Sequence, residues 1–273
     1  MLNLKCVKIL GMNKWSRRRK RVIVSLIFFG ILILVAIPSY LLFYKTPTCF
    51  DNKRNSDETG VDCGGSCQLL CTAESLPLII KGDPQVLEVK EGVFEVVALV
   101  DNPNIDAEIY RAKYFIRLYS AKSIAPTRVI EGETFVPKGV KFAIFEGPFT
   151  TSDGAIPIKA TIEWREDSLA WKKNNSPIPI LKVISKMVSK EDTIPRLDAV
   201  IENASLKNVS NIDAISLVYN DKGTIFAASK TFIDSLAVGA NAPIVFSWPE
   251  PFGEKILNIE IILRVLPDRS FIR

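Results

Sequence analysis

The sequence predicts an all-β protein that follows one apolar helix and a small cysteine-rich segment. Residues 22–44 carry no charge, and four of the five cysteines lie within residues 49–71. The rest of the chain consists of short runs rich in Val, Ile, Phe and Tyr, separated by Asn, Gly, Pro and Asp. No second helical pattern of comparable length occurs, so we expect strands after residue 75.

The net charge of +5 is distributed unevenly along the chain. Residues 1–21 form a basic tail with eight Lys and Arg and no acidic residue, which leaves 27 basic and 30 acidic residues for the rest. A nucleic-acid-binding domain carries its basic excess on the folded part, so we expect no nucleic-acid partner. The chain also has no His, which removes the commonest general acid/base and metal ligand.

The 23 residues 22–44 are long enough to cross a membrane as a helix, since about 20 apolar residues suffice. Only Lys45 follows them directly, whereas five basic residues precede them: Arg17, Arg18, Arg19, Lys20 and Arg21. The positive-inside rule therefore predicts a single-pass protein of the cell membrane, with a cytoplasmic N-terminus and extracytoplasmic C-terminal domains. A cleaved signal peptide is the alternative, but the run is longer than usual and residues 37–40 (IPSY) make a poor cleavage site.

A cysteine-rich extracytoplasmic module is expected over residues 45–75. Its four cysteines are Cys49, Cys63, Cys67 and Cys71. An even number of cysteines on the oxidising side indicates two disulfides, with three connectivities open. A zinc site is the alternative. It is disfavoured because three residues separate successive members of the last three cysteines, where a zinc knuckle has two.

The loop between the first two cysteines contains oxygen ligands that suit a hard cation such as calcium. The candidate ligands are Asp51, Asn55, Asp57 and Asp62. The EF-hand pattern does not fit, because Lys and Ser occupy its third and sixth positions. The alternative is a polar turn in which short side chains bond their own backbone. Apart from calcium, we expect no cofactor.

Residues 49–51 (CFD) and 58–67 (ETGVDCGGSC), with Cys71, resemble a short cysteine-rich module of predicted surface and secreted proteins, mainly bacterial. The chain departs from that module at Asn52 and Ser56, which replace glycines, and in the spacing of the last cysteine. The resemblance implies an extracytoplasmic surface protein and no particular reaction.

The predicted strands fall into two repeats with a period of about 100 residues. They are residues 93–100, 112–119, 141–145, 158–164, 197–201, 215–219, 224–228, 244–248 and 256–265, with opening strands within 78–90 and 181–192. Seven or so short strands per repeat predict two tandem immunoglobulin-like β-sandwiches. The expected domains are residues 76–170 and 180–273, joined by a linker over residues 171–179.

Corresponding segments support the repeat. Residues 99–104 (LVDNPN) align with residues 200–205 (VIENAS), and residues 145–149 (FEGPF) align with 246–252 (FSWPEPF). We expect Asn102 and Asn203 to bond backbone groups where their strands end. The pairing of these Asn segments with Leu118-Tyr119-Ser120 and with residues 217–223 (LVYNDKG) resembles the FxLYD and late-embryogenesis-abundant families. That resemblance implies exposed sandwiches without catalytic residues.

The sequence offers no catalytic motif: it has no G-x-S-x-G elbow, no phosphate-binding glycine loop, and Ser-Lys neighbours that point to opposite faces of a strand. We therefore expect a structural or interaction protein of a bacterial cell envelope and not an enzyme. Its partners would be the lipid bilayer and other envelope or surface proteins. The alternative is an ectodomain that binds a glycan or peptide ligand, with weak hydrolase activity at most.

Overall fold

The computed structural model describes residues 14–43, 48–151 and 156–267. The chain divides into two compact units, residues 1–51 and 52–273. The first unit contains helix α1 (Lys14–Phe43), which is long and apolar enough to span a membrane from Arg18 to Phe43. The helix begins before the apolar run, so the basic residues from Lys14 to Arg21 lie in its first turns. Tyr44, the last residue of the predicted span, lies outside the described residues.

The second unit is all-β, as the sequence predicts, and its described strands are antiparallel. The strands of its first half are β1 (Ile79–Ile80), β2 (Gln85–Lys90), β3 (Val93–Asp101), β4 (Ala107–Ser120), β5 (Arg128–Val136), β6 (Lys141–Thr150), β7 (Pro157–Trp164) and β8 (Lys172–Lys173). Those of its second half are β9 (Leu181–Ser189), β10 (Arg196–Asn203), β11 (Val209–Tyr219), β12 (Ile225–Leu236), β13 (Asn241–Ser247) and β14 (Asn258–Val265). Among the described residues, Thr72–Glu74 and Glu166–Ser168 form short 3-10 helices.

Each half consists of two small sheets with the same connectivity. In the first half, β3 lies between β6 and the pair β1 and β2, and β4 lies between β5 and the pair β7 and β8. In the second half, β10 lies between β9 and β13, and β11 lies between β12 and β14. Strands β3, β4, β5, β6 and β7 therefore correspond to β10, β11, β12, β13 and β14, which matches the sequence repeat.

Each half has its own apolar core between its two sheets. Val96, Ala98 and Val100 of β3 pack with β4 residues such as Ile116 and Leu118 in the first core. The second core is built in the same way from β10 and β11, together with β12, β13 and β14. Removal of this apolar surface from water is the main driving force for folding of both halves.

Asn102 and Asn203 bond backbone groups at the ends of their strands, as predicted, and their backbone hydrogen bonds follow the same pattern. The Asn102 amide donates to the carbonyls of Ala107 (2.9 Å) and Pro137 (2.8 Å), and its oxygen accepts the N–H of residue 104 (3.0 Å). The Asn203 amide donates to the carbonyls of Lys207 and Leu236 (both 2.9 Å), and its oxygen accepts the N–H of residue 205 (3.0 Å). The same arrangement of a buried Asn side chain at the end of β3 and of β10 supports the repeat.

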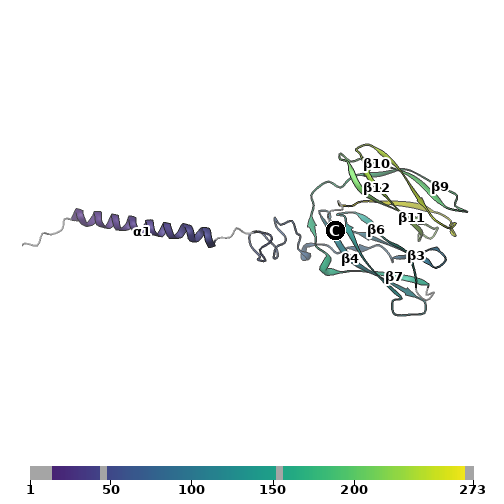
Figure 1. Ribbon diagram of the computed structural model, residues 1–273, viewed down its shortest axis with the longest axis horizontal. Helices are drawn as coiled ribbons and strands as arrows, with labels where there is room; N and C mark the ends of the chain where they lie inside the picture. The colour runs from purple at the N-terminus through teal and green to yellow at the C-terminus, as the bar shows by residue number, and fades with distance from the viewer. Residues whose placement is uncertain (1–13, 44–47, 152–155, 268–273) are drawn as a thin grey trace, which may run out of the picture. The chain divides into compact units, whose positions relative to one another are not determined.

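The two halves stack face to face. Val97 of β3 and Ala143 of β6 pack against Ile215 and Leu217 of β11 and Ile262 of β14 in a third buried cluster. In Figure 1, the strands of the second half (β9, β10, β11 and β12) accordingly lie against those of the first (β3, β4, β6 and β7). Strands β3 and β11 are therefore buried on both faces, with alternate residues in different clusters.

The connection between the halves is shorter than the sequence suggested. The expected linker begins at Trp171, but this side chain is 3% exposed and belongs to the first core. Lys172 and Lys173 then pair with β4 as strand β8. The ordered first half thus continues to residue 173, because an aromatic side chain at position 171 completes its core.

Candidate functional site

The cysteine module contains two disulfides. Cys63 is bonded to Cys71, with 5.0 Å between their Cα atoms. Cys49 and Cys67 are disulfide-bonded as well, which leaves them as the second pair. Of the three connectivities that the sequence left open, the structure has first to third and second to fourth. Four oxidised cysteines provide no thiolates for zinc, so the zinc alternative does not apply to this oxidised form.

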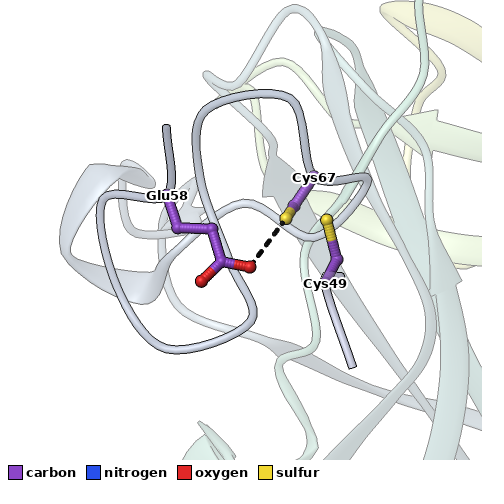
Figure 2. A group of neighbouring side chains, drawn as sticks. All are labelled: Cys49, Glu58 and Cys67. Atoms are coloured by element: carbon purple, nitrogen blue, oxygen red, sulfur yellow. Dashed lines mark hydrogen bonds between the residues drawn. The ribbon is translucent and has the colours of Figure 1, made fainter. Parts of the chain in front are cut away.

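Glu58 is the buried acidic residue of the module, with 7% of its surface exposed. One carboxylate oxygen accepts the backbone N–H of Asn55 at 3.1 Å, and the other lies 3.3 Å from the Cys67 sulfur. Figure 2 shows Glu58 beside Cys67 and Cys49. Both sulfurs are in disulfides and cannot form the thiolates that bind metals. The contact of Glu58 with these two cysteines is therefore one of packing, and the three residues do not form a metal site.

The carboxylates proposed for calcium contact protein groups within the loop. Asp62 accepts the N–H of Asn52 with both oxygens, at 3.0 and 3.2 Å. Asp57 accepts the Ser66 hydroxyl at 2.8 Å, and this hydrogen bond lowers the pKa of Asp57. These contacts are those of a polar, self-bonded turn. Calcium binding by Asp51, Asn55, Asp57 and Asp62 stays a prediction.

A polar network crosses the interface between the two halves. The guanidinium of Arg264 on β14 donates to the Thr134 hydroxyl (2.8 Å) and the Phe135 carbonyl (3.0 Å) of β5, and to the Asp213 carboxylate (3.0 Å) of β11. The Arg264 and Asp213 side chains are 9% and 4% exposed. Lys230 also lies 3.1 Å from Asp213. A buried ion pair with further hydrogen bonds fixes the relative position of the elements that carry it.

A second ion pair supports the same interface. Lys141 of β6 lies 2.6 Å from Glu260 of β14, and the Tyr219 hydroxyl donates to the other Glu260 oxygen at 2.9 Å. Burial and this contact with Glu260 raise the pKa of Tyr219. The two halves are thus joined by apolar packing and by side-chain bonds.

Glu95 is a buried charged residue beside this interface that, unlike Asp213 and Glu260, has no ion-pair partner among the described residues. It lies on β3 between apolar residues and is 8% exposed. The β3–β6 ladder is interrupted between Phe94 and Val96, where Gly147 and Pro148 of β6 lie opposite Glu95. A Cβ atom at position 147, where φ is +132°, would lie 2.8 Å from the Glu95 Cγ. Glycine is therefore required there, and the bulge makes room for the Glu95 side chain.

Burial of the carboxyl raises the pKa of Glu95 to about 7. Removal of a carboxylate from water disfavours its charged form, which is why the pKa rises. Within the described residues, the Glu95 side chain has neither a hydrogen bond nor an ion pair. Perturbed groups of this kind cluster at functional sites.

Two adjoining cavities open beside Glu95, with volumes of about 420 and 440 Å³. Both lie between the halves: β2 and β3 contribute from one side, and β12 and the segment after β13 contribute from the other. The first cavity is lined by the aromatic residues Phe226, Trp248 and Phe252, and also by Glu88, Glu91 and Glu250. Cavities with mixed aromatic and charged walls are typical binding sites.

A third cavity of about 390 Å³ lies under the connecting segment and is lined by Tyr110, Phe135 and Ile178. Its cationic groups are already engaged: Lys138 donates to the carbonyls of Asn174 and Ser176, and Arg264 belongs to the interface network. This cavity is therefore a weaker candidate for ligand recognition than the one beside Glu95.

Glu95 was not identified as a candidate from the sequence. Its signal is an acidic residue in the middle of an apolar run, VFEVVALV, where alternation places it on the same face as Val97 and Leu99. The motifs FEGPF and FSWPEPF, which the repeat alignment had paired, supply Gly147, Trp248 and Phe252 to the same region. These residues come together with Glu95 only because the two halves pack face to face, which the sequence does not indicate.

No protein-family model and no curated protein matches the chain. Among solved structures, red sea bream transglutaminase matches with 11% identity and a TM-score of 0.21, covering 75% of this chain and 30% of that one. Bacteroides uniformis beta-glucuronidase matches with 11% identity and a TM-score of 0.20, covering 65% of this chain and 26% of that one. The chain thus spans less than a third of either protein.

Proposed function

We propose that the chain is a single-pass membrane protein with a cytoplasmic N-terminus and an extracytoplasmic all-β unit that serves as a structural or interaction module of the cell envelope. The observation that carries the proposal is the joining of the two halves by a buried apolar cluster and by the Arg264–Asp213 network. Two halves joined in this way would present one continuous surface to a partner or hold a spacing between neighbours. We assign no enzymatic activity to it.

The apolar helix supports the proposed anchor, and the basic residues at its start support the proposed orientation. The two disulfides support an oxidising location for residues 49–71. The alternative, a cleaved signal peptide, would remove the N-terminal segment from the mature protein. The two alternatives therefore differ in the mass of the mature chain. They also differ in whether the mature chain keeps Cys6, which an anchor retains on the cytoplasmic side and cleavage removes.

The chain carries a natural reporter of topology in Cys6. In intact cells, we expect a membrane-impermeant maleimide to leave Cys6 unlabelled until the membrane is permeabilised, while the four external cysteines react only after reduction. The Cys6→Ser variant is the matched control, since it loses the permeabilisation-dependent label alone. Labelling of Cys6 from outside, or a mature mass without residues 1–21, would contradict the proposed anchor.

The interaction role is tested by photo-crosslinking of the full chain in its native membranes, followed by mass spectrometry. We expect one or a few reproducible envelope partners that attach to the all-β unit. Recovery of none across replicate preparations would count against the proposal. A glycan array and a panel of hydrolase substrates, applied to the full chain in detergent, test the alternative, because saturable glycan binding or turnover would replace the proposed role.

A further inference from the structure

The cavity beside Glu95 has an unbalanced charge. Glu88, Glu91, Glu95 and Glu250 line it, and Lys90 is the one basic residue among its lining residues. Lys230 lines the adjoining cavity, but its ammonium group lies 3.1 Å from Asp213. The cavity therefore carries an excess of negative charge, and its deepest carboxylate has no cationic partner among the described residues.

The apolar part of the wall includes three aromatic residues, Phe226, Trp248 and Phe252. The ring centroids of Trp248 and Phe252 lie 5.0 Å apart, and those of Phe226 and Phe252 lie 5.5 Å apart, both pairs in edge-on arrangements. The Trp248 indole N–H is bonded to the Ala228 carbonyl at 2.8 Å, which fixes the ring. Aromatic faces attract cations through their quadrupole, and fixed rings do so without a cost in side-chain ordering.

An inorganic divalent cation does not suit this wall. Ca²⁺ and Mg²⁺ take six or more oxygen ligands, and zinc is held mainly by Cys and His, neither of which lines this cavity. Here one carboxylate is buried and the other three belong to exposed residues. An organic cation matches both components of the cavity, because its alkyl part packs on the rings while its charged end pairs with a carboxylate. The volume of about 420 Å³ is in the range of small-ligand sites.

We propose that this cavity binds an alkylammonium group, which pairs with the Glu95 carboxylate while its alkyl chain packs on Trp248 and Phe252. The group could be carried by a free diamine or by a lysine side chain of a peptide, since both present the same chemistry. The proposal is independent of the orientation in the membrane and of any envelope partner.

The proposal makes binding depend on pH. The groups that face Glu95 are Glu88, Lys90 and Glu91 from β2 and its turn, Lys230 from β12 and Glu250 from the segment after β13. Glu95 has its pKa raised to about 7, so about a tenth of it is ionised at pH 6 and about nine tenths at pH 8. An alkylammonium ligand should therefore bind about tenfold more tightly at pH 8 than at pH 6.

The test is isothermal titration of the full chain in detergent with 1,5-diaminopentane, with a short capped peptide containing one lysine, and with 1,5-pentanediol as the uncharged isostere. We expect saturable binding of the diamine, the peptide or both at pH 8, about tenfold weaker binding at pH 6, and none by the diol. The response to diamine against peptide distinguishes the two sources of the cation.

Two variants complete the design. Glu95→Gln removes the charge with little change in shape and should abolish binding at pH 8, while Glu131→Gln on the exposed strand β5 should bind like the unsubstituted chain. Unfolding curves of both variants verify that they are folded. Absence of binding by both ammonium probes, equal binding of the diol, or unchanged binding by Glu95→Gln would overturn the proposal.

Discussion

Replacement of Glu95 by glutamine should stabilise the protein in a pH-dependent manner. The folded-state pKa of about 7 exceeds the ordinary value of 4.5, so the folded state holds the proton more tightly than the unfolded state. The free energy of unfolding of the unsubstituted protein therefore falls as pH rises from about 4.5, and the fall is complete slightly above pH 7. Glutamine has no proton to lose, so the Glu95→Gln variant should not show this loss of stability with rising pH.

The magnitude follows from a folded-state pKa of about 7 against an ordinary value of 4.5, since each pKa unit corresponds to about 1.4 kcal/mol. The Glu95→Gln substitution should thus stabilise the fold by about 3 kcal/mol at pH 8 and by less than about 1 kcal/mol at pH 5. The assay is urea unfolding of the full chain in detergent, followed by tryptophan fluorescence, at both pH values. The exposed Glu131→Gln variant should match the unsubstituted protein throughout. An equal effect of Glu95→Gln at both pH values would refute the reasoning.

Three further substitutions test the interface and the repeat by urea unfolding. Arg264→Met leaves Asp213 buried with Lys230 alone and should cost about 3–5 kcal/mol, and a cost below about 1 kcal/mol would mean that the network contributes little. Leu217→Ala in the cluster between the halves should cost about 2–5 kcal/mol, whereas a negligible loss would argue against tight packing of the halves. Asn203→Ala leaves buried backbone groups unbonded and should cost about 1–3 kcal/mol, and an unchanged midpoint would contradict its capping role.

The strand pattern could be predicted from the sequence because alternation and turn residues are local signals. Strand β5 was missed, since it contains Gly132 and several charged residues and its residues are mostly exposed or half-buried. The structure explains this glycine: a Cβ atom at position 132 would lie 2.3 Å from the Tyr114 ring. The glycine at this position is required by a side chain on another strand, so it gives no local signal that predicts a strand.

The stacking of the halves and the Glu95 cavity lay beyond sequence reasoning for a different reason. The runs VFEVVALV and AISLV are apolar at nearly every position, which is typical of strands buried on both faces. That pattern shows that a second covering layer exists but does not identify it. The disulfide pairing is similar, because sequence spacing allows three connectivities and only the folded loop distinguishes them.

Face-to-face stacking also determines how the chain can be divided or rearranged. A fragment that ends near residue 175 would expose Val97, Ala143 and Leu87 to water, and a fragment that begins there would expose Ile215 and Leu217. Each half alone would therefore present an apolar sheet face, which is a surface prone to aggregation. The two halves share one strand connectivity, but each covers an apolar sheet face of the other. Replacement of one half alone by an unrelated domain should therefore yield insoluble protein.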